Sequence, residues 1–263
     1  VALKHVFTSV PANAGCLRPI TFVVPDTTLL GAKAPKPMAG YTETILRLIG
    51  VVFGALAKAD PARATAAPFG TINALSLAGH RKDGSRWVML SFFGGGMGGN
   101  PESDGLNHAN NPISTATIPP VEILEAAYPV MFTQWALRPD SAGAGEHRGG
   151  LGAIYEIEAL TDAEVFLLGE RGKVPPFGVV GGAPAATNRF TWDTAEGQAS
   201  PPLVSKVTDV KIRVGQRVRL ETPGGGGWGP PARRDPAKLR RDLRLGFVTP
   251  AAARHDYGVE SEA

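Results

Sequence analysis

Cysteine is nearly absent from this sequence, because Cys16 is the single one among 263 residues. One thiol excludes a disulfide within the chain and any metal site that needs several cysteines. Such scarcity is typical of proteins that work in a reducing compartment, so the sequence predicts a cytoplasmic location. Cys16 lies near Arg18, whose guanidinium could lower the pKa of the thiol and make it a nucleophile. A buried structural cysteine is the alternative.

Long hydrophobic runs and an excess of one charge are also missing. The longest apolar stretch, residues 45–57, contains Arg47 and two glycines, and it is too short to span a bilayer. The first residues lack the basic segment and the sustained apolar run of a secretory signal. The net charge is only +3, and Lys and Arg do not alternate with aromatic residues as a nucleic-acid surface requires. The sequence therefore predicts neither membrane nor nucleic acid as a partner.

Glycine and proline, by contrast, are abundant. The 33 glycines and 23 prolines are spread over many short turns, which is typical of short strands joined by ordered loops. We therefore expect the α+β class, with β-rich mixed sheets, one long amphipathic helix and a short helical C-terminus. The expected domains are a β-rich unit over residues 1–230 and a helical extension over residues 231–263.

Local patterns predict the individual elements. Apolar residues at helical spacing predict a helix over residues 41–59, with Thr42 or Thr44 as its N-cap. Asp235 and Thr249, each followed by proline, predict two C-terminal helices, whose neighbouring basic residues we expect mostly on the outer faces. The other predicted elements are two strands within residues 1–24, a hairpin over 69–78 and 86–93, a helix over 119–128, and strands over 130–137, 153–160, 164–169 and 206–220.

Glycines gather in a central segment, residues 91–128, that has little helix or strand periodicity before residue 121. Its glycines, residues 94–96, 98 and 99, could bring backbone amides close to a ligand, or they could serve turns and close packing of the backbone. A phosphate-binding loop is excluded, because no Lys-Ser or Lys-Thr follows and the next residues are Asn100 and Pro101.

Polar residues follow these glycines in the densest polar group of the sequence, which comprises Asp104, Asn107, His108, Asn110, Asn111, Ser114 and Thr115. Asp104 and His108 could supply two ligands of a hard metal, but two ligands do not make a site. A structural loop stabilised by Asn and Asp side chains is the alternative. Further along, Arg138 and Asp140 stand between two predicted strands, where such a pair is typically a structural clamp.

Six loop sequences together resemble a known family. They are NAGCLRPI, GGGMGGNPESDG, IPPVEILEAAYPV, LRPDSAGAGEHRGGLG, PPFGVVGG and TPGGGGWGPP. In order and spacing they resemble the B-type subunits of the hydantoinase/oxoprolinase family. The resemblance covers nearly the whole chain and corresponds to the C-terminal half of those subunits.

This resemblance implies a multi-subunit enzyme that opens cyclic amides such as hydantoins, 5-oxoproline or lactams, or that carboxylates ketones. It implies as partners the N-terminal half of the B-type subunit and an A-type subunit that binds ATP, in a hetero-oligomer that acts on a small molecule. ATP and a divalent metal would belong to the complete complex. We expect neither to be bound by this chain alone, because the family's metal motifs lie in the N-terminal half and match no positions here.

The main hypothesis assigns roles to residues of the central loops. Asp104, His108 and Asn110 would be catalytic and would orient the substrate or a water molecule. Gly95, Gly96 and Gly98 would bind the substrate through backbone amides that act as oxyanion-type donors. Arg138 and Asp140 would brace the substrate-binding side. Two other hypotheses are a non-catalytic assembly module and a self-contained thiol hydrolase that uses Cys16.

Overall fold

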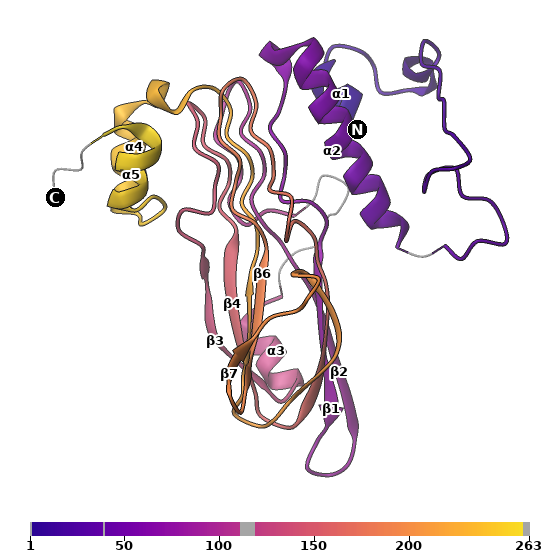
Figure 1. Ribbon diagram of the computed structural model, residues 1–263, viewed down its shortest axis with the longest axis vertical. Coiled ribbons are helices and arrows are strands. Elements are labelled where there is room, and N and C mark those ends of the chain that lie inside the picture. Colours follow the sequence, from indigo (N-terminus) through magenta and orange to yellow (C-terminus); the bar gives the residue numbers. More distant parts are fainter. Residues whose placement is uncertain (1, 39, 111–118, 260–263) are drawn as a thin grey trace.

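The computed structural model describes residues 2–38, 40–110 and 119–259, and it confirms the α+β class (Figure 1). The strands form two sheets, in the orders β2-β1-β5-β8 and β3-β4-β9-β6-β7. Each of their strand pairs is antiparallel, where mixed sheets were expected. The strands are β1 (Asn73–His80), β2 (Arg86–Phe93), β3 (Val130–Leu137), β4 (Ala153–Ala159), β5 (Ala163–Leu168), β6 (Arg189–Thr194), β7 (Gly197–Ala199), β8 (Lys206–Ile212) and β9 (Arg217–Glu221). The helices are α1 (Ala2–Val6), α2 (Tyr41–Ala59), α3 (Val121–Ala127), α4 (Pro236–Arg244) and α5 (Pro250–Tyr257).

The main hydrophobic core lies between the two sheets, which form the lower part of Figure 1. Strand β2 alternates exposed and buried residues along its whole length, as the period of a half-buried strand requires. Leu75 and Leu77 of β1 meet Tyr155 and Ile157 of β4 in this core, and all four are fully buried. Burial of one such side chain contributes roughly 1.5–3 kcal/mol, so this core is the main source of stability in the lower part.

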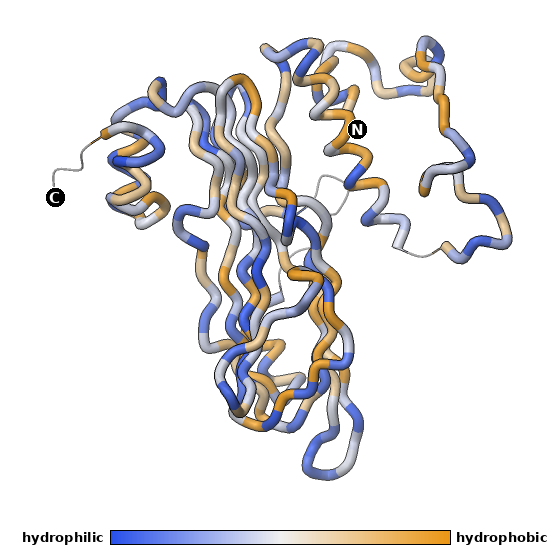
Figure 2. The backbone as a smooth tube through the Cα atoms, in the orientation of Figure 1, coloured by the Kyte–Doolittle hydropathy of each residue, from blue (hydrophilic) through white to orange (hydrophobic). Residues whose placement is uncertain are grey.

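Helix α2 has the predicted span, but its N-cap differs from the prediction. Gly40, in the left-handed conformation, precedes the helix without a side-chain cap, and the Thr42 hydroxyl donates to the Glu43 carboxylate instead. The helix buries Leu46 and Phe53 against α1, and Figure 2 shows hydrophobic residues along much of it. Within the described ranges, no helix combines the length and apolar character needed to cross a bilayer.

The two strands predicted within residues 1–24 are wrong. The structure has helix α1 there and a short 3-10 turn, η1 (Ala14–Leu17), and residues 18–25 follow without strand pairing. The alternation of apolar residues that predicted a strand has no partner strand beside it, and Phe22 and Val23 are 71% and 82% exposed. A strand pattern without a neighbouring sheet edge gains neither ladder hydrogen bonds nor burial.

Glycine-rich segments form a separate layer above the sheets, between α2 and the C-terminal helices, where extended chains run side by side in Figure 1. We call it the glycine bundle and define it as residues 64–70, 94–99, 105–109, 142–152, 176–183 and 222–229. Its chains exchange backbone hydrogen bonds with several neighbours at once. Gly95 donates to Ala109, Gly96 to Pro223 and Gly99 to Gly226, with N···O distances of 3.1, 3.0 and 2.9 Å.

The bundle requires glycine because its chains are too close for side chains. A Cβ atom on Gly96 would lie 1.8 Å from the carbonyl oxygen of Gly150, and one on Gly98 would lie 1.9 Å from that of Ala66. The close-packing interpretation of the central glycines is therefore confirmed. Whether they also approach a ligand stays a prediction.

The C-terminal helices begin at the predicted caps and pack onto the bundle. The side chains of Asp235 and Thr249 accept hydrogen bonds from the first turns of α4 and α5. Leu239 of α4 and Tyr257 of α5 pack with Ala144 of the bundle in a small core of their own. The domain boundary at residue 230 stays a prediction.

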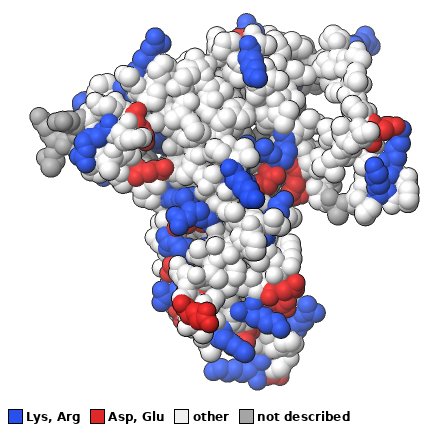
Figure 3. All heavy atoms as spheres, viewed as in Figure 1, with Lys and Arg blue, Asp and Glu red and all other residues white. Residues whose placement is uncertain are grey.

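Charged side chains of both signs are interspersed over the sheets in Figure 3, while much of the upper surface in that view is uncharged.

Candidate functional site

The polar loop over residues 100–110 leaves the glycine bundle through a turn built by Asn100. The Asn100 Oδ1 atom accepts hydrogen bonds from the backbone amides of Glu102 and Ser103, at 2.9 and 3.0 Å. Asn and Asp side chains stabilise turns in this way. Asp104 follows directly, so the turn determines the position of the Asp104 side chain.

Asp104 is held by Arg234, which lies just before α4. Arg234 Nη1 and Nη2 each donate to one carboxylate oxygen of Asp104, both at 2.9 Å, and the Arg148 amide donates to Asp104 at 2.8 Å. Arg234 also pairs with Asp242 of α4 at 2.7 Å, and Arg148 pairs with the same carboxylate at 3.2 Å. Burial alone would raise the pKa of Asp104, but the Arg234 and Arg148 interactions outweigh it and hold the pKa below its ordinary value.

Arg234 is an exception to the expectation that the C-terminal basic residues lie mostly on outer faces, because its side chain is 1% exposed. A buried guanidinium needs acceptors for its donors, and two carboxylates accept from its Nη atoms here, while its Nε has no partner among the described residues. Because both oxygens of Asp104 are occupied, this carboxylate ties the loop to the C-terminal helices. Its predicted role in orienting substrate or water is not tested by these contacts and stays a prediction.

His108 is the second predicted catalytic residue, and it contacts Tyr155 of β4 rather than Asp104. Its Nε2 atom is hydrogen-bonded to the Tyr155 hydroxyl, and its ring lies 6.2 Å from the Trp135 ring in an edge-on arrangement. The backbone of His108 has a φ of 44°, in the left-handed region, and its amide donates to Leu151 at 2.8 Å. Position and ring orientation are thus both fixed by the fold.

The protonation of this pair follows from its surroundings. Burial lowers the pKa of His108 and raises the pKa of Tyr155 well above its ordinary value, so both groups are neutral near pH 7. We assign the Tyr155 hydroxyl as the donor of this hydrogen bond, which leaves the imidazole proton on Nδ1. The imidazole can therefore donate one hydrogen bond from Nδ1 without carrying a charge.

Asn110 is the last described residue of this loop. Asn111, Ser114 and Thr115, which belong to the predicted polar group, lie outside the described residues. Asn107 is engaged, because its Oδ1 atom accepts from the Leu151 amide at 2.9 Å and from Arg148 at 3.2 Å. The structure therefore brings Asn107 and His108 together against residues 148–151.

Arg138 and Asp140 do not pair with each other within the described part of the chain. Arg138 donates to the carbonyl oxygen of Thr187 at 2.7 Å and forms an ion pair with Glu221 at 3.4 Å. The Asp140 carboxylate accepts from the Thr249 amide at 2.8 Å, at the start of α5. Each side chain therefore clamps a different part of the chain. Their predicted place beside the substrate stays untested.

Two of the three predicted oxyanion donors already have acceptors within the bundle. The amides of Gly95 and Gly96 donate to Ala109 and Pro223, as described above. A substrate oxygen could use these two donors only by displacing the bundle's own carbonyl groups. The substrate-binding assignment of Gly95, Gly96 and Gly98 stays a prediction.

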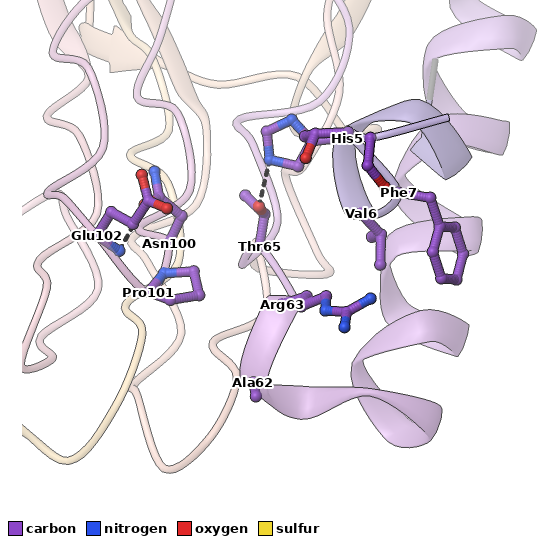
Figure 4. Close-up of a pocket in the computed structure, with 11 residues that line it drawn as sticks. His5, Val6, Phe7, Ala62, Arg63, Thr65, Asn100, Pro101 and Glu102 are labelled. Atoms are coloured by element: carbon purple, nitrogen blue, oxygen red, sulfur yellow. Dashed lines mark hydrogen bonds between the residues drawn. The ribbon is translucent and has the colours of Figure 1, made fainter. Parts of the chain in front are cut away.

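A polar pocket that the sequence did not predict lies beside the same loop (Figure 4). It has a volume of about 490 Å³, and Figure 4 shows His5 and Arg63 on one side and Asn100 and Glu102 on the other. His5 Nε2 lies 2.6 Å from the Thr65 hydroxyl, and burial lowers the pKa of His5. These residues come from segments far apart in the sequence, and the N-terminal segment was predicted to be a strand, so no local pattern pointed to the pocket.

Neither a metal cluster nor an activated thiol stands out. Among the described residues, no group of three or more His, Cys, Asp and Glu side chains could hold a metal ion. Cys16 is partly exposed, and its thiol donates to the carbonyl oxygen of Asn13 at 2.8 Å. No hydrogen bond in the described ranges joins this thiol to a side chain that could act as its base. The thiol-hydrolase hypothesis gains no support from this geometry.

Comparison with known proteins gives the family. The model of the hydantoinase B/oxoprolinase family matches residues 1–231. This chain belongs to that family. The caprolactamase subunit beta of Pseudomonas jessenii is 33% identical over an alignment of 263 positions that covers 95% of this chain and 45% of that subunit. The 5-oxoprolinase of Dictyostelium discoideum is 28% identical over 231 residues, 85% of this chain and 17% of that protein.

A solved structure agrees with the family assignment. The crystal structure of the ATP-dependent caprolactamase from Pseudomonas jessenii matches with a TM-score of 0.82 and 28% identity, over 100% of this chain and 48% of the other. The family resemblance in the loop sequences is thereby confirmed. This chain spans less than half the length of these curated relatives.

Proposed function

We propose that this hydantoinase B-family chain is the C-terminal part, or a separate small subunit, of a B-type enzyme that hydrolyses a cyclic amide such as a hydantoin, 5-oxoproline or a lactam. The observation that carries the proposal is the likeness of the whole chain to the ATP-dependent caprolactamase. The partners would be the N-terminal half of the B-type subunit and an A-type subunit that binds ATP. ATP bound there would supply the phosphoryl group that converts the amide oxygen into a leaving group.

His108 is the residue of this chain that we propose to touch the substrate or the attacking water. Its neutral imidazole would donate from Nδ1 to the substrate oxygen or to the water, while Tyr155 holds the ring and its tautomer. A neutral donor suits a site that handles an uncharged cyclic amide. Asn110, two residues further on, would contact the same ligand.

The remaining residues of the site would hold its loops in place and would not touch the substrate. Asp104 and Arg234 fix the loop that carries His108 to the C-terminal helices. Arg138 and Asp140 fix the ends of β9 and α5 against the glycine bundle. A divalent metal would belong to the N-terminal half of the enzyme, since the described residues of this chain offer no ligand cluster for it.

The experiment that tests the function combines native mass spectrometry of the complex with an assay of ring opening. The chain is purified with its natural partners, the bound chains are identified by native mass spectrometry, and ring opening of hydantoin, 5-oxoproline and caprolactam is assayed with and without ATP. We expect co-purification of an ATP-binding chain and ATP-dependent opening of one ring. Bicarbonate-dependent consumption of a ketone would instead establish the ketone carboxylase alternative, and a complex that turns over equally well without this chain would establish the assembly module.

A further inference from the structure

A second pocket, distinct in its residues from those above, has four basic side chains in its lining. It has a volume of about 480 Å³ and lies where α2, the loop after β5 and the start of β8 meet. We call it the basic pocket, and its charged and polar lining residues are Arg47, Glu170, Arg171, Lys173, Ser205 and Lys206. It contains four cationic side chains and one carboxylate, so its lining has an excess of positive charge.

The cations of the basic pocket share a single carboxylate, that of Glu170, which cannot pair with all four of them. Arg47 Nε lies 3.4 Å from Glu170 Oε2, an ion pair without hydrogen-bond geometry, and this oxygen has no hydrogen-bond partner among the described residues. Burial raises the pKa of Glu170, against the opposing effects of Arg47, Arg171 and Lys206. A carboxylate that burial makes harder to ionise is a weak counterion for its neighbours.

Arg171 is the decisive residue of this pocket, because it is 7% exposed and yet incompletely bonded. Among the described residues, its Nη atoms make only long hydrogen bonds, to the carbonyl oxygens of Pro175 at 3.4 Å and Pro68 at 3.5 Å. Its buried Nε has no hydrogen-bond partner in the described ranges. Burial and the nearby Arg47 lower the pKa of Arg171 to about 10, so the side chain still carries its charge near pH 7. Buried donors of a charged group ordinarily have acceptors.

The backbone around Arg171 holds it in this position. Its φ is 62°, a conformation that non-glycine residues adopt rarely and that often marks functional sites. The Arg171 carbonyl accepts from the Asn188 amide at 3.0 Å, which fixes the conformation. Gly70, with a φ of 115°, leaves room for the pair, since a Cβ there would lie 3.1 Å from Arg171 Cγ and 3.2 Å from Glu170 Oε2.

We propose that the basic pocket is a binding site for a small anion with at least two negative charges, a phosphate or a dicarboxylate. Such a ligand would accept from the Nη atoms of Arg171, whose hydrogen bonds to Pro175 and Pro68 are long, and would serve Arg47 and Lys206 as a counterion. Arginine suits this task because its planar donors match the oxygens of carboxylate and phosphate. The inference does not depend on the proposed hydrolase function, because it rests on the lining residues alone.

The test is isothermal titration of the 263-residue chain with inorganic phosphate and, separately, with malonate, at constant ionic strength. The variants are Arg47→Gln and Lys206→Gln, and the matched control is Lys211→Gln, an exposed lysine of the same strand that does not line the pocket. We expect saturable binding of one of the two anions, weakened about tenfold by either pocket variant and unchanged by the control. Whichever anion binds identifies the ligand class.

Two results overturn the proposal. One is the absence of saturable binding for both anions, and the other is an equal loss of affinity in Lys211→Gln, which shows attraction to the general surface charge. Arg171→Lys is a further variant that keeps the charge but loses the planar donors. It should weaken binding while thermal unfolding shows that the variant is folded, and unchanged binding in this folded variant also contradicts the proposal.

Discussion

Arg234 binds both carboxylate oxygens of Asp104, at 2.9 Å each, across 130 residues of sequence. The pair joins the loop that carries His108 to the helices at the C-terminus. The guanidinium also holds Asp242, so one buried cation serves two carboxylates. The stability of the loop therefore depends on a segment that the sequence marks only as a basic helical extension.

Substitution of Arg234 tests this dependence. Arg234→Leu should lower the free energy of unfolding by about 3–5 kcal/mol, because it leaves the Asp104 carboxylate without its guanidinium and the buried Asp242 carboxylate with Arg148 alone. The matched control is Arg233→Leu, since Arg233 is exposed and precedes Arg234 directly. It should change stability by no more than about 0.5 kcal/mol. Urea unfolding of both variants measures the difference, and equal effects would show that the network contributes nothing of its own.

Acid should weaken the same connection. The folded-state pKa of Asp104 lies below its ordinary value of 3.8, so the ion pair stabilises the fold above that pH and the contribution is lost as pH falls toward the folded pKa. Asp104→Asn lacks this contribution. The stability difference between the wild type and Asp104→Asn should therefore shrink as pH is lowered from 6 to about 3. A difference that stays constant over this range would contradict the assignment.

Two glycine substitutions, one in the glycine bundle and one in helix α2, should have opposite effects on stability. Gly96→Ala should prevent folding or leave a chain that unfolds at much lower temperature, because its Cβ would lie 1.8 Å from a backbone oxygen. Gly50→Ala, in helix α2, has no atom within 4 Å of the new Cβ. It should stabilise the protein by about 0.5–1 kcal/mol, because alanine favours the helix over glycine. Circular dichroism on heating compares the two, and a well-folded Gly96→Ala protein would refute the close packing.

His108 should be neutral, with its proton on Nδ1, in the wild-type protein. Its folded pKa lies below 6.5, so folding favours the neutral ring, and this contribution to stability is lost as pH falls below that value. Nitrogen NMR of labelled histidine reports both the tautomer and the titration. Tyr155→Phe removes the hydroxyl that donates to Nε2, so it should shift the tautomer equilibrium of His108. The loss of this hydrogen bond should also lower the free energy of unfolding by about 1 kcal/mol. An Nε2-protonated ring in the wild type would show that the hydrogen bond runs the other way.

Periodicity in the sequence predicted those elements whose stability is local. Helix α2 and strand β2 follow from the spacing of apolar residues, and Asp235 and Thr249 identify the C-terminal helices because side-chain caps act within one turn. The hairpin of β6 and β7 was missed, although Phe190 and Trp192 alternate with polar residues there. Its strands are short and polar, and β6 is stabilised by pairing with β9 rather than by its own pattern.

The site could be predicted only in part, for a related reason. The central glycines and polar residues were recognised as a segment, since their types are unusual together. Their partners were not, because Arg234, Tyr155 and Leu151 reach the loop through the tertiary fold and leave no spacing in the sequence. The N-terminal strands were predicted from alternation alone, and alternation does not show whether a sheet edge is available.

The most direct test of the account is turnover by the assembled complex with His108→Ala in this chain. The native mass of the complex is measured in parallel, to show that the variant assembles. The account predicts that the variant assembles as the wild type does and opens the cyclic amide at least about 100-fold more slowly, because a donor at the reacting oxygen is lost. Asn13→Ala, at the exposed residue that caps the 3-10 turn η1, is the control and should keep full activity. Full turnover by an assembled His108→Ala complex would contradict the catalytic role of this chain.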